Sequence, residues 1–437
     1  MNIVIAGGRV IDPHQGIDRV CSVFISYGRI VGFEPPPGFT ADRVIEADQW
    51  IVCPGLIDLR ARLREPGLEH KATLEGELQA AAAGGITTVC CPPDTTPPID
   101  NPAIAEWMIE RANRLGAARI LPIGALTRGL SGTHLADMHT LRMAGCIGVG
   151  NAYAAIKDTA VLRHAMEYAA GLDLLVFLTP EDPWLNAHGL MHEGRVSTRL
   201  GLAGIPASAE TIALSRDLIL IEQTGVRAHF CGLSTAHGVA LIREAKGRGL
   251  PVTADTPIHQ LYLTEDDIGF FDSNCHLRPP LRTTSDRDAL RKAFADGVID
   301  ALCSDHQPHE EDVKRVPFSD SELGIAGLET LLPLTLRLVD TGVLPLADAL
   351  AGLTCRPATI LGIPYGTLAE GRPADVCIFD PRADWIPGAT TVRTHGHNSP
   401  FFGTPMRGQV VATIKDGVIC YERSPSSKDT TRARAPG

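Results

Sequence analysis

The feature that most constrains the fold is an alternation, from about residue 55 to 365, of short apolar runs with longer segments of helical period. Amphipathic stretches such as 73–83, 159–170, 209–224 and 237–248 separate most of these runs. Eight strand–helix units close most naturally as a parallel barrel with helices outside. We therefore predict an α/β fold with a (β/α)8 TIM barrel over residues 55–365. The eight runs with the length and composition of buried strands are Leu56–Leu59, Ile86–Cys91, Arg119–Gly124, Cys146–Val149, Asp173–Leu178, Arg227–Cys231, Pro251–Ala254 and Ile299–Ser304.

The two chain ends have a different pattern, in which short alternating strands are separated by Gly-rich turns. The strand candidates are Asn2–Ile5, Val20–Ile25, Val376–Phe379 and Val410–Lys415. We predict that residues 1–54 and 366–422 form one composite domain, a small β-sandwich. Residues 423–437 lack apolar periodicity, and we predict a disordered tail there.

Composition and charge restrict the classes of function. With 44% hydrophobic and 21% charged residues the chain can bury a large core, while its net charge of -11 and lack of a Lys/Arg cluster argue against nucleic acid and anionic membrane as partners. No apolar run reaches the ~18 residues of a membrane span, and the start, MNIVIAGGRVIDP, has no basic leader of a signal peptide. The 11 scattered cysteines contain no C-x-x-C and suit reduced thiols. We expect a cytoplasmic protein with small-molecule or protein partners.

Barrels of this kind carry their chemistry at the carboxyl ends of the strands. A hydrolytic metal site needs several imidazoles and carboxylates that converge on one point. The first strand is followed instead by Arg60 and Arg62, whose guanidinium groups are not metal ligands. Candidate ligands follow the seventh and eighth strands, at Asp255, His259 and Asp305–His309. The residues alone therefore argue against a conventional metal site.

The chain resembles the dihydroorotase branch of the amidohydrolase superfamily over nearly its whole length. The motifs that carry the resemblance are Pro54–Leu59, Leu63–Gly67, Arg195–Pro206, Pro279–Arg282, Ser304–His309 and Gly324–Glu329. The resemblance implies a zinc-dependent (β/α)8 barrel with a small β domain. Active members interconvert carbamoyl aspartate and dihydroorotate in pyrimidine synthesis.

The departures from the family pattern fall where the resemblance implies metal ligands. Of that ligand set only Asp305 is retained, a residue that in active members binds metal and shuttles a proton. We therefore expect no metal cofactor and an inactive Asp305. The remaining ligand positions are occupied by Arg60, Arg62, Ala152, Thr179 and Gly232.

The substrate-binding side is partly kept. Arg64 and His309 match positions that hold the substrate carboxylate in the family, whereas Asp94 stands in place of the family's Asn. The negative charge of Asp94 would repel a substrate carboxylate. Binding of dihydroorotate is therefore expected to be weak or absent, with Arg64 and His309 as vestigial binding residues.

Two hypotheses follow. In the first, the chain is a non-catalytic homologue, similar to the dihydroorotase-like chains that serve as structural subunits for the catalytic chain of aspartate carbamoyltransferase, and forms a homo-oligomer as well. In the second, it is an active dihydroorotase or other cyclic-amide hydrolase whose remodelled, mononuclear metal site uses Asp305, His309, His259 and Asp255. The first hypothesis explains the lost ligands more simply.

The first hypothesis makes two structural predictions. Arg60 or Arg62 should pair with Asp305 across the barrel mouth in place of the missing cations; the alternative is that the two arginines form a new anion site. The aromatic residues to inspect as anchors for a partner are Trp184, Phe270–Phe271 and Phe401–Phe402, although core packing is the commoner role for such residues.

Overall fold

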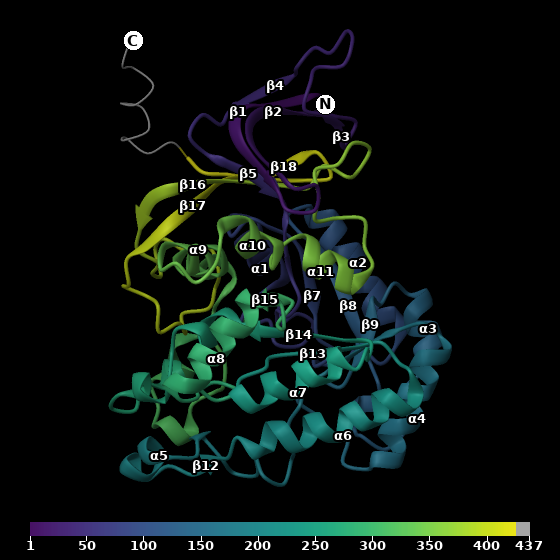
Figure 1. Cartoon of the computed structure of the whole chain (residues 1–437), viewed down its shortest axis with the longest axis vertical. Coiled ribbons are helices and arrows are strands. Elements are labelled where there is room, and N and C mark those ends of the chain that lie inside the picture. Colours follow the sequence, from purple (N-terminus) through teal and green to yellow (C-terminus); the bar gives the residue numbers. More distant parts are fainter. Residues whose placement is uncertain (425–437) are drawn as a thin grey trace.

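The computed structural model describes residues 1–424, and its larger part is a nearly closed barrel of eight parallel strands (Figure 1). The strands are paired in the order β15-β14-β13-β10-β9-β8-β7-β6. Between β15 and β6 the barrel is closed beyond the strand ends, where the Arg62 N–H donates to the His306 carbonyl at 2.8 Å. All eight predicted strands are confirmed: β6 (Leu56–Asp58), β7 (Ile86–Cys91), β8 (Arg119–Ala125), β9 (Gly148–Gly150), β10 (Leu175–Leu178), β13 (Ala228–Phe230), β14 (Val252–Pro257) and β15 (Ala301–Cys303).

Helices cover the outside of the barrel, and local sequence signals set their ends. In α2, the Asn101 side chain caps the first turn, Pro102 occupies its first position, and Gly116 ends the helix in the left-handed region at φ 74°. The helices are α1 (Leu74–Ala83), α2 (Pro102–Leu115), α3 (Met138–Met143), α4 (Thr159–Gly171), α5 (Arg195–Leu200), α6 (Ser208–Thr224), α7 (Ala236–Gly247), α8 (Thr284–Ala295), α9 (Leu331–Asp340), α10 (Leu346–Ala351) and α11 (Cys355–Leu361). A short parallel pair, β11 (Met191–His192) and β12 (Gly204–Ile205), flanks α5.

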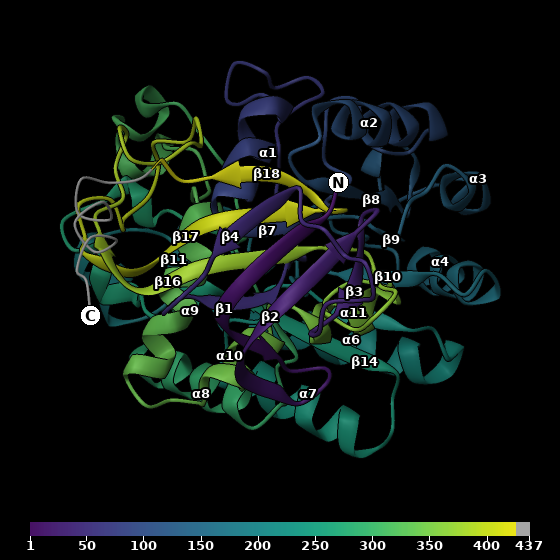
Figure 2. The same ribbon diagram turned by 90° about the horizontal axis from the view of Figure 1, so that it is seen from above.

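Strands from both chain ends form the small β domain, in which β5 lies between β1 from the N-terminal part and β16 from the C-terminal part (Figure 2). The eight strands belong to one mixed sheet, in the order β18-β17-β16-β5-β1-β2-β3 with β4 paired to β1. Its own apolar core includes Ile3, Ile5, Val376 and Ile378. The strands are β1 (Ile3–Asp12), β2 (Ile17–Ser26), β3 (Arg29–Gly32), β4 (Arg43–Glu46), β5 (Ile51–Pro54), β16 (Val376–Trp385), β17 (Met406–Lys415) and β18 (Val418–Glu422).

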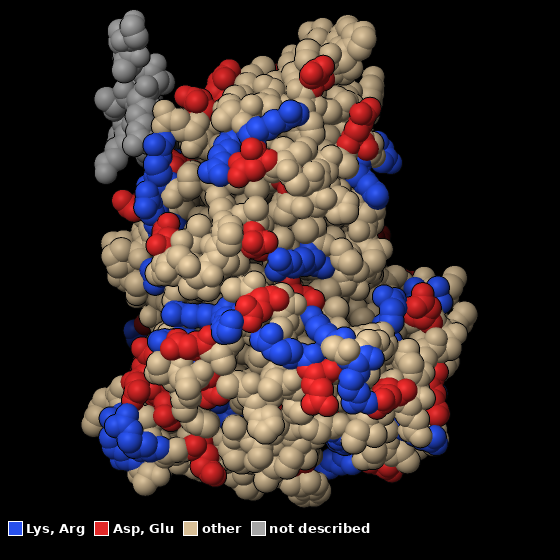
Figure 3. Space-filling model, in the orientation of Figure 1, with Lys and Arg blue, Asp and Glu red and all other residues tan. Residues whose placement is uncertain are grey.

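Two further sequence predictions concern the surface and the end of the chain. Within residues 1–424, no helix is both long and apolar enough to cross a bilayer. On the face drawn in Figure 3, basic and acidic side chains are interspersed. The predicted disordered tail lies outside the described residues from position 425 onward.

Candidate functional site

The site predicted from the sequence lies where the first and eighth barrel strands end. The Asp58 carboxylate ties these two ends together, because it accepts the Ser304 N–H at 3.0 Å and the Arg60 N–H at 3.3 Å. Burial raises the pKa of Asp58 to about 6, although the bonds from Ser304 act in the opposite direction. From this fixed backbone, the side chains of Arg60 and Arg62 both reach Asp305.

Arg60 and Asp305 form a buried ion pair at the centre of the mouth. Arg60 Nε lies 2.6 Å from Asp305 Oδ1, and the two side chains are 4% and 3% exposed. Arg60 Nη2 also donates to the Tyr153 hydroxyl at 3.0 Å, while Arg62 Nη1 lies 3.5 Å from the same Asp305 oxygen. Burial by itself lowers the pKa of Arg60, but Asp305 and Tyr153 outweigh it and hold the pKa well above its ordinary value. The predicted pairing across the mouth is confirmed.

Gly232 leaves the space that the Arg60 guanidinium fills. A Cβ at this position would lie 2.7 Å from Arg60 Nη1, and the backbone has a φ of +73°, which favours glycine. The Gly232 N–H donates to Asp255 Oδ1 at 2.6 Å. A side chain at 232 would therefore force the Arg60 guanidinium away from its place beside Asp305. Because a fixed cation occupies this volume, the residues present do not fit the zinc site that the family resemblance implies.

Tyr153 organises the other charged groups of the mouth. Three guanidinium carbons lie over its ring, those of Arg278, Arg62 and Arg60 at 4.4, 4.7 and 5.5 Å from the ring centroid. Arg278 Nε is paired with Glu181 at 2.6 Å, and the Tyr153 hydroxyl donates to the Arg278 carbonyl. Burial raises the pKa of Tyr153 to about 12, so its hydroxyl keeps its proton.

Tyr153 and Glu181 each lie three residues after a barrel strand, β9 and β10, but we did not predict this cluster from the sequence. The available signal was their position directly after the fourth and fifth strands, opposite two arginines. Ala152 and Thr179, at two of the family's ligand positions, line a cavity here with a volume of about 20 Å³. That volume is enough for a water molecule.

Asp94 is paired with an arginine. Arg62 Nε donates to Asp94 Oδ2 at 2.8 Å, whereas Asp94 Oδ1 is buried without a hydrogen-bond partner. The repulsion expected from this carboxylate is therefore reduced by Arg62, because the pair carries no net charge. The buried free oxygen still opposes a second carboxylate nearby.

Arg64 and His309 lie together, as expected for two residues of one binding site. Arg64 Nη2 lies 2.9 Å from His309 Nε2, and Arg64 Nε donates to the Pro308 carbonyl at 3.0 Å. Burial, with Arg64 and Lys71 nearby, lowers the pKa of His309 to about 2, so the imidazole is neutral. Burial and the charge of Arg62 lower the pKa of Arg64 to about 10.

Little room remains for a substrate at this mouth. Besides the cavity beside Ala152, one lined by Tyr153 and Gly232 holds about 20 Å³ and one lined by Arg64 and Asp94 about 10 Å³. Small-molecule sites typically measure roughly 300 to 1,000 Å³. The side chains of the mouth therefore pack against each other instead of enclosing a ligand.

Among residues 1–424, no three residues of the remodelled-metal hypothesis have potential ligand atoms within 4.8 Å of one another. Asp255 is engaged below the mouth by His229, and His309 by Arg64. His259 is buried, neither ring nitrogen has a hydrogen-bond partner, and burial lowers its pKa to about 4. Asp305 is held by Arg60.

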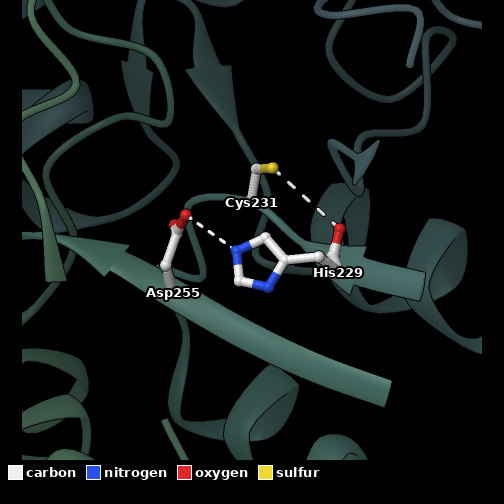
Figure 4. A group of neighbouring side chains, drawn as sticks. All are labelled: His229, Cys231 and Asp255. Carbon is white, nitrogen blue, oxygen red and sulfur yellow. Dashed lines mark hydrogen bonds and ion pairs between the residues drawn. The ribbon is translucent and has the colours of Figure 1, made fainter. Parts of the chain in front are cut away.

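A different group inside the barrel has ligand-type side chains (Figure 4). Potential ligand atoms of His229, Cys231 and Asp255 lie within 4.8 Å of one another, the one such group among residues 1–424. His229 Nε2 lies 3.0 Å from Asp255 Oδ2 and its Nδ1 2.8 Å from the Thr253 hydroxyl. Burial raises the pKa of Cys231, which keeps the thiol protonated. Because both imidazole nitrogens are occupied, we interpret the group as the polar core of the barrel.

The family described as "Dihydro-orotase-like" matches residues 49–237. A dihydroorotase-like protein from Pseudomonas aeruginosa is 46% identical over 97% of this chain and 100% of the relative. A dihydroorotase from Syntrophotalea carbinolica is 43% identical over 97% of this chain and 100% of the relative. Among solved structures, L-hydantoinase (dihydropyrimidinase) from Arthrobacter aurescens has a TM-score of 0.85 at 24% identity, covering 97% of this chain and 96% of that one.

The barrel and its small β domain thus have the fold of the amidohydrolase-type barrels. Within that class the chain belongs to the dihydroorotase family, which confirms the resemblance found in its motifs.

Proposed function

We propose that this chain is a non-catalytic, dihydroorotase-like protein of pyrimidine biosynthesis that serves as a structural partner of the aspartate carbamoyltransferase catalytic chain. The observation that carries the first part is the Arg60 guanidinium, bound to Asp305 in the space beside Gly232. The second part rests on the family resemblance.

The absence of hydrolysis follows from the chemistry of the mouth. Opening a cyclic amide at neutral pH needs an activated water, and a zinc ion supplies one by lowering the pKa of bound water to ~7. A guanidinium has no vacant orbital for a water oxygen and does not release a proton near neutral pH. The carboxylate that would act as a base, Asp305, accepts a hydrogen bond from Arg60 at 2.6 Å. The pair replaces both the Lewis acid and the free base.

Metal content tests this part directly. After expression with added zinc and dialysis, elemental analysis should find well below one zinc per chain. One tightly held zinc per chain would contradict the proposal and favour the remodelled hydrolase, whose candidate ligands include His259 and Asp305.

The partner proposal needs an accessible surface with anchor residues. Trp184 is 72% exposed and Phe270 is 91% exposed, so both are available, whereas Phe401 is 4% exposed and packs in the core. Trp184 is held in place by Lys157, whose Nζ lies 4.6 Å from the ring centroid. We propose these two aromatic residues as the first to probe for the transferase and for self-association.

Co-expression with the cognate transferase, followed by size-exclusion chromatography, is the direct test. We expect one co-eluting complex, which Trp184→Ala or Phe270→Ala weakens and the buried Arg60→Ala variant, if folded, does not. Separate elution at micromolar concentration, with a transferase that is stable and active alone, would contradict the partner proposal.

A cytoplasmic location is part of the same proposal. All eleven cysteines are free thiols, and most are buried. Reduced cysteines suit a reducing compartment. When the native cells are fractionated, we expect the protein in the cytosolic fraction.

A further inference from the structure

The described part of the chain contains a much larger cavity at the opposite end of the barrel. Its volume is about 420 Å³, within the ~300 to 1,000 Å³ range of small-molecule sites. It lies where β10, β13 and β14 begin, and it is bounded by α11 and by His14 of the β1–β2 turn. In Figure 1, α11 lies between the β domain and the strands β13 and β14. This cavity is separate from the barrel mouth.

Its walls combine an apolar floor with two cations. The floor includes Leu175, Val252 and Ile360, and the cations are Arg227 and Arg356. The one carboxylate among the lining residues, Asp300, accepts from Lys246 Nζ at 2.6 Å and from the Ala254 N–H at 2.8 Å. Lys246 matches the charge of Asp300, and the carboxylates opposite the two arginines, Asp173 and Asp348, lie outside the lining.

Arg356 has unused hydrogen-bonding capacity. Its Nη1 is buried and has no hydrogen-bond partner, and its Nη2 reaches Asp348 only at 3.5 Å. A buried N–H donor without an acceptor costs free energy, which an anionic ligand would recover. Arg227 Nε lies 3.3 Å from Asp173 Oδ1, and the Asp173 side chain is 82% exposed. An exposed ion pair of this kind contributes little to stability, so Arg227 can exchange Asp173 for a ligand.

The hydroxyl groups of the cavity are largely committed to the protein. Thr253 Oγ1 lies 2.8 Å from His229 Nδ1, and the Thr359 hydroxyl donates to the Cys355 carbonyl at 2.8 Å. The donors left for a ligand are therefore those of the two arginines and of the His14 ring, which come from different elements. A phosphate has three terminal oxygens and a charge near −2, so it can accept hydrogen bonds from two guanidinium groups and match the charge of both.

We propose that this cavity binds a small phosphomonoester. Its phosphate is held by Arg356 and Arg227, and its apolar body lies on the floor formed by Leu175, Val252 and Ile360. The proposal is independent of whether the barrel mouth is catalytic, and it assigns a ligand to the end of the barrel that carries no active-site residues.

Phenyl phosphate is a suitable probe for titration calorimetry on the full-length protein, because it joins the dianion to an apolar ring. It should bind more tightly than inorganic phosphate, which lacks the ring, and than phenol, which lacks the charge. Losing one charge-assisted contact should weaken binding about tenfold or more in Arg356→Gln. The matched control is Arg243→Gln, which removes an exposed guanidinium paired with Asp296 and should leave the affinity unchanged.

A second measurement uses the unaltered protein. Cys355 lines the cavity and is partly exposed, so phenyl phosphate should slow its alkylation by iodoacetamide, while the partly exposed Cys21 should react at an unchanged rate. The proposal is overturned if phenyl phosphate does not bind, if phenol binds equally well, or if Arg356→Gln binds as the parent does. Equal slowing at Cys21 and Cys355 would also overturn it.

Discussion

Removing the Arg60 side chain should lower the free energy of unfolding far more than removing an exposed, paired arginine would. In Arg60→Ala, Asp305 keeps only two long contacts, to Arg62 Nη1 at 3.5 Å and Gln307 Nε2 at 3.4 Å. Breaking a buried ion pair by removing one partner costs roughly 3 to 5 kcal/mol. Since the remaining contacts offset little of this, we expect the free energy of unfolding to fall by about 3 kcal/mol or more.

A double-mutant cycle measures the pair itself. Urea unfolding of Arg60→Ala, Asp305→Ala and the double variant, followed by circular dichroism, should give a coupling free energy of about 2 to 3 kcal/mol. The control is Arg243→Ala, whose exposed pair with Asp296 at 3.3 Å should contribute less than about 1 kcal/mol. If Arg60→Ala costs no more than this control, or the coupling is near zero, the reasoning about the buried pair is wrong.

Three further predictions test the mouth. Gly232→His should lower the free energy of unfolding by about 2 kcal/mol or more. In the double variant with Arg60→Ala, the loss should be about 1 to 3 kcal/mol smaller than the sum of the two single losses, because the two side chains compete for one space. Additive losses in urea unfolding would contradict this. Burial lowers the pKa of His259 from 6.5 to about 4, so only the unfolded chain takes up this proton as pH falls below 6.5. Stability should therefore drop between pH 7 and 5 by about 2 kcal/mol less in His259→Leu than in the parent, and the exposed control His14→Leu should follow the parent; parallel pH profiles for all three would refute the argument. Arg60→His combined with Arg62→His should show no dihydroorotase activity with added zinc, since other ligand positions remain unfilled, and turnover above a no-protein control would oppose this.

Much of the barrel could be predicted because its strands are short, apolar and buried on both sides. Ile86–Cys91 reads as a continuous apolar or β-branched run, and all six of its residues are buried. Strands of the β domain such as Arg29–Gly32 and Ile51–Pro54 were not predicted. Each has four residues, too few for a period to be recognised, and pairing with β1 or β2 defines them instead.

The site was predictable where charge balance alone decides the contact. Asp305 needed a cation, and Arg60 and Arg62 were the two candidates once all three residues were placed at strand ends. The exclusion between Gly232 and Arg60 depends on a positive φ and on the path of a long side chain, which spacing does not reveal. The same holds for Tyr153, whose ring became the common platform of three arginines through side-chain directions set by the tertiary structure.

Dihydroorotate turnover is the most direct test of the claim that this dihydroorotase-family chain is non-catalytic. The purified protein, supplemented with zinc and assayed at micromolar concentration, should form carbamoyl aspartate no faster than buffer with zinc. Asp305→Ala should give the same background rate. Turnover by the parent protein that Asp305→Ala abolishes would contradict the account, because it would show that the carboxylate paired with Arg60 still performs the family's chemistry.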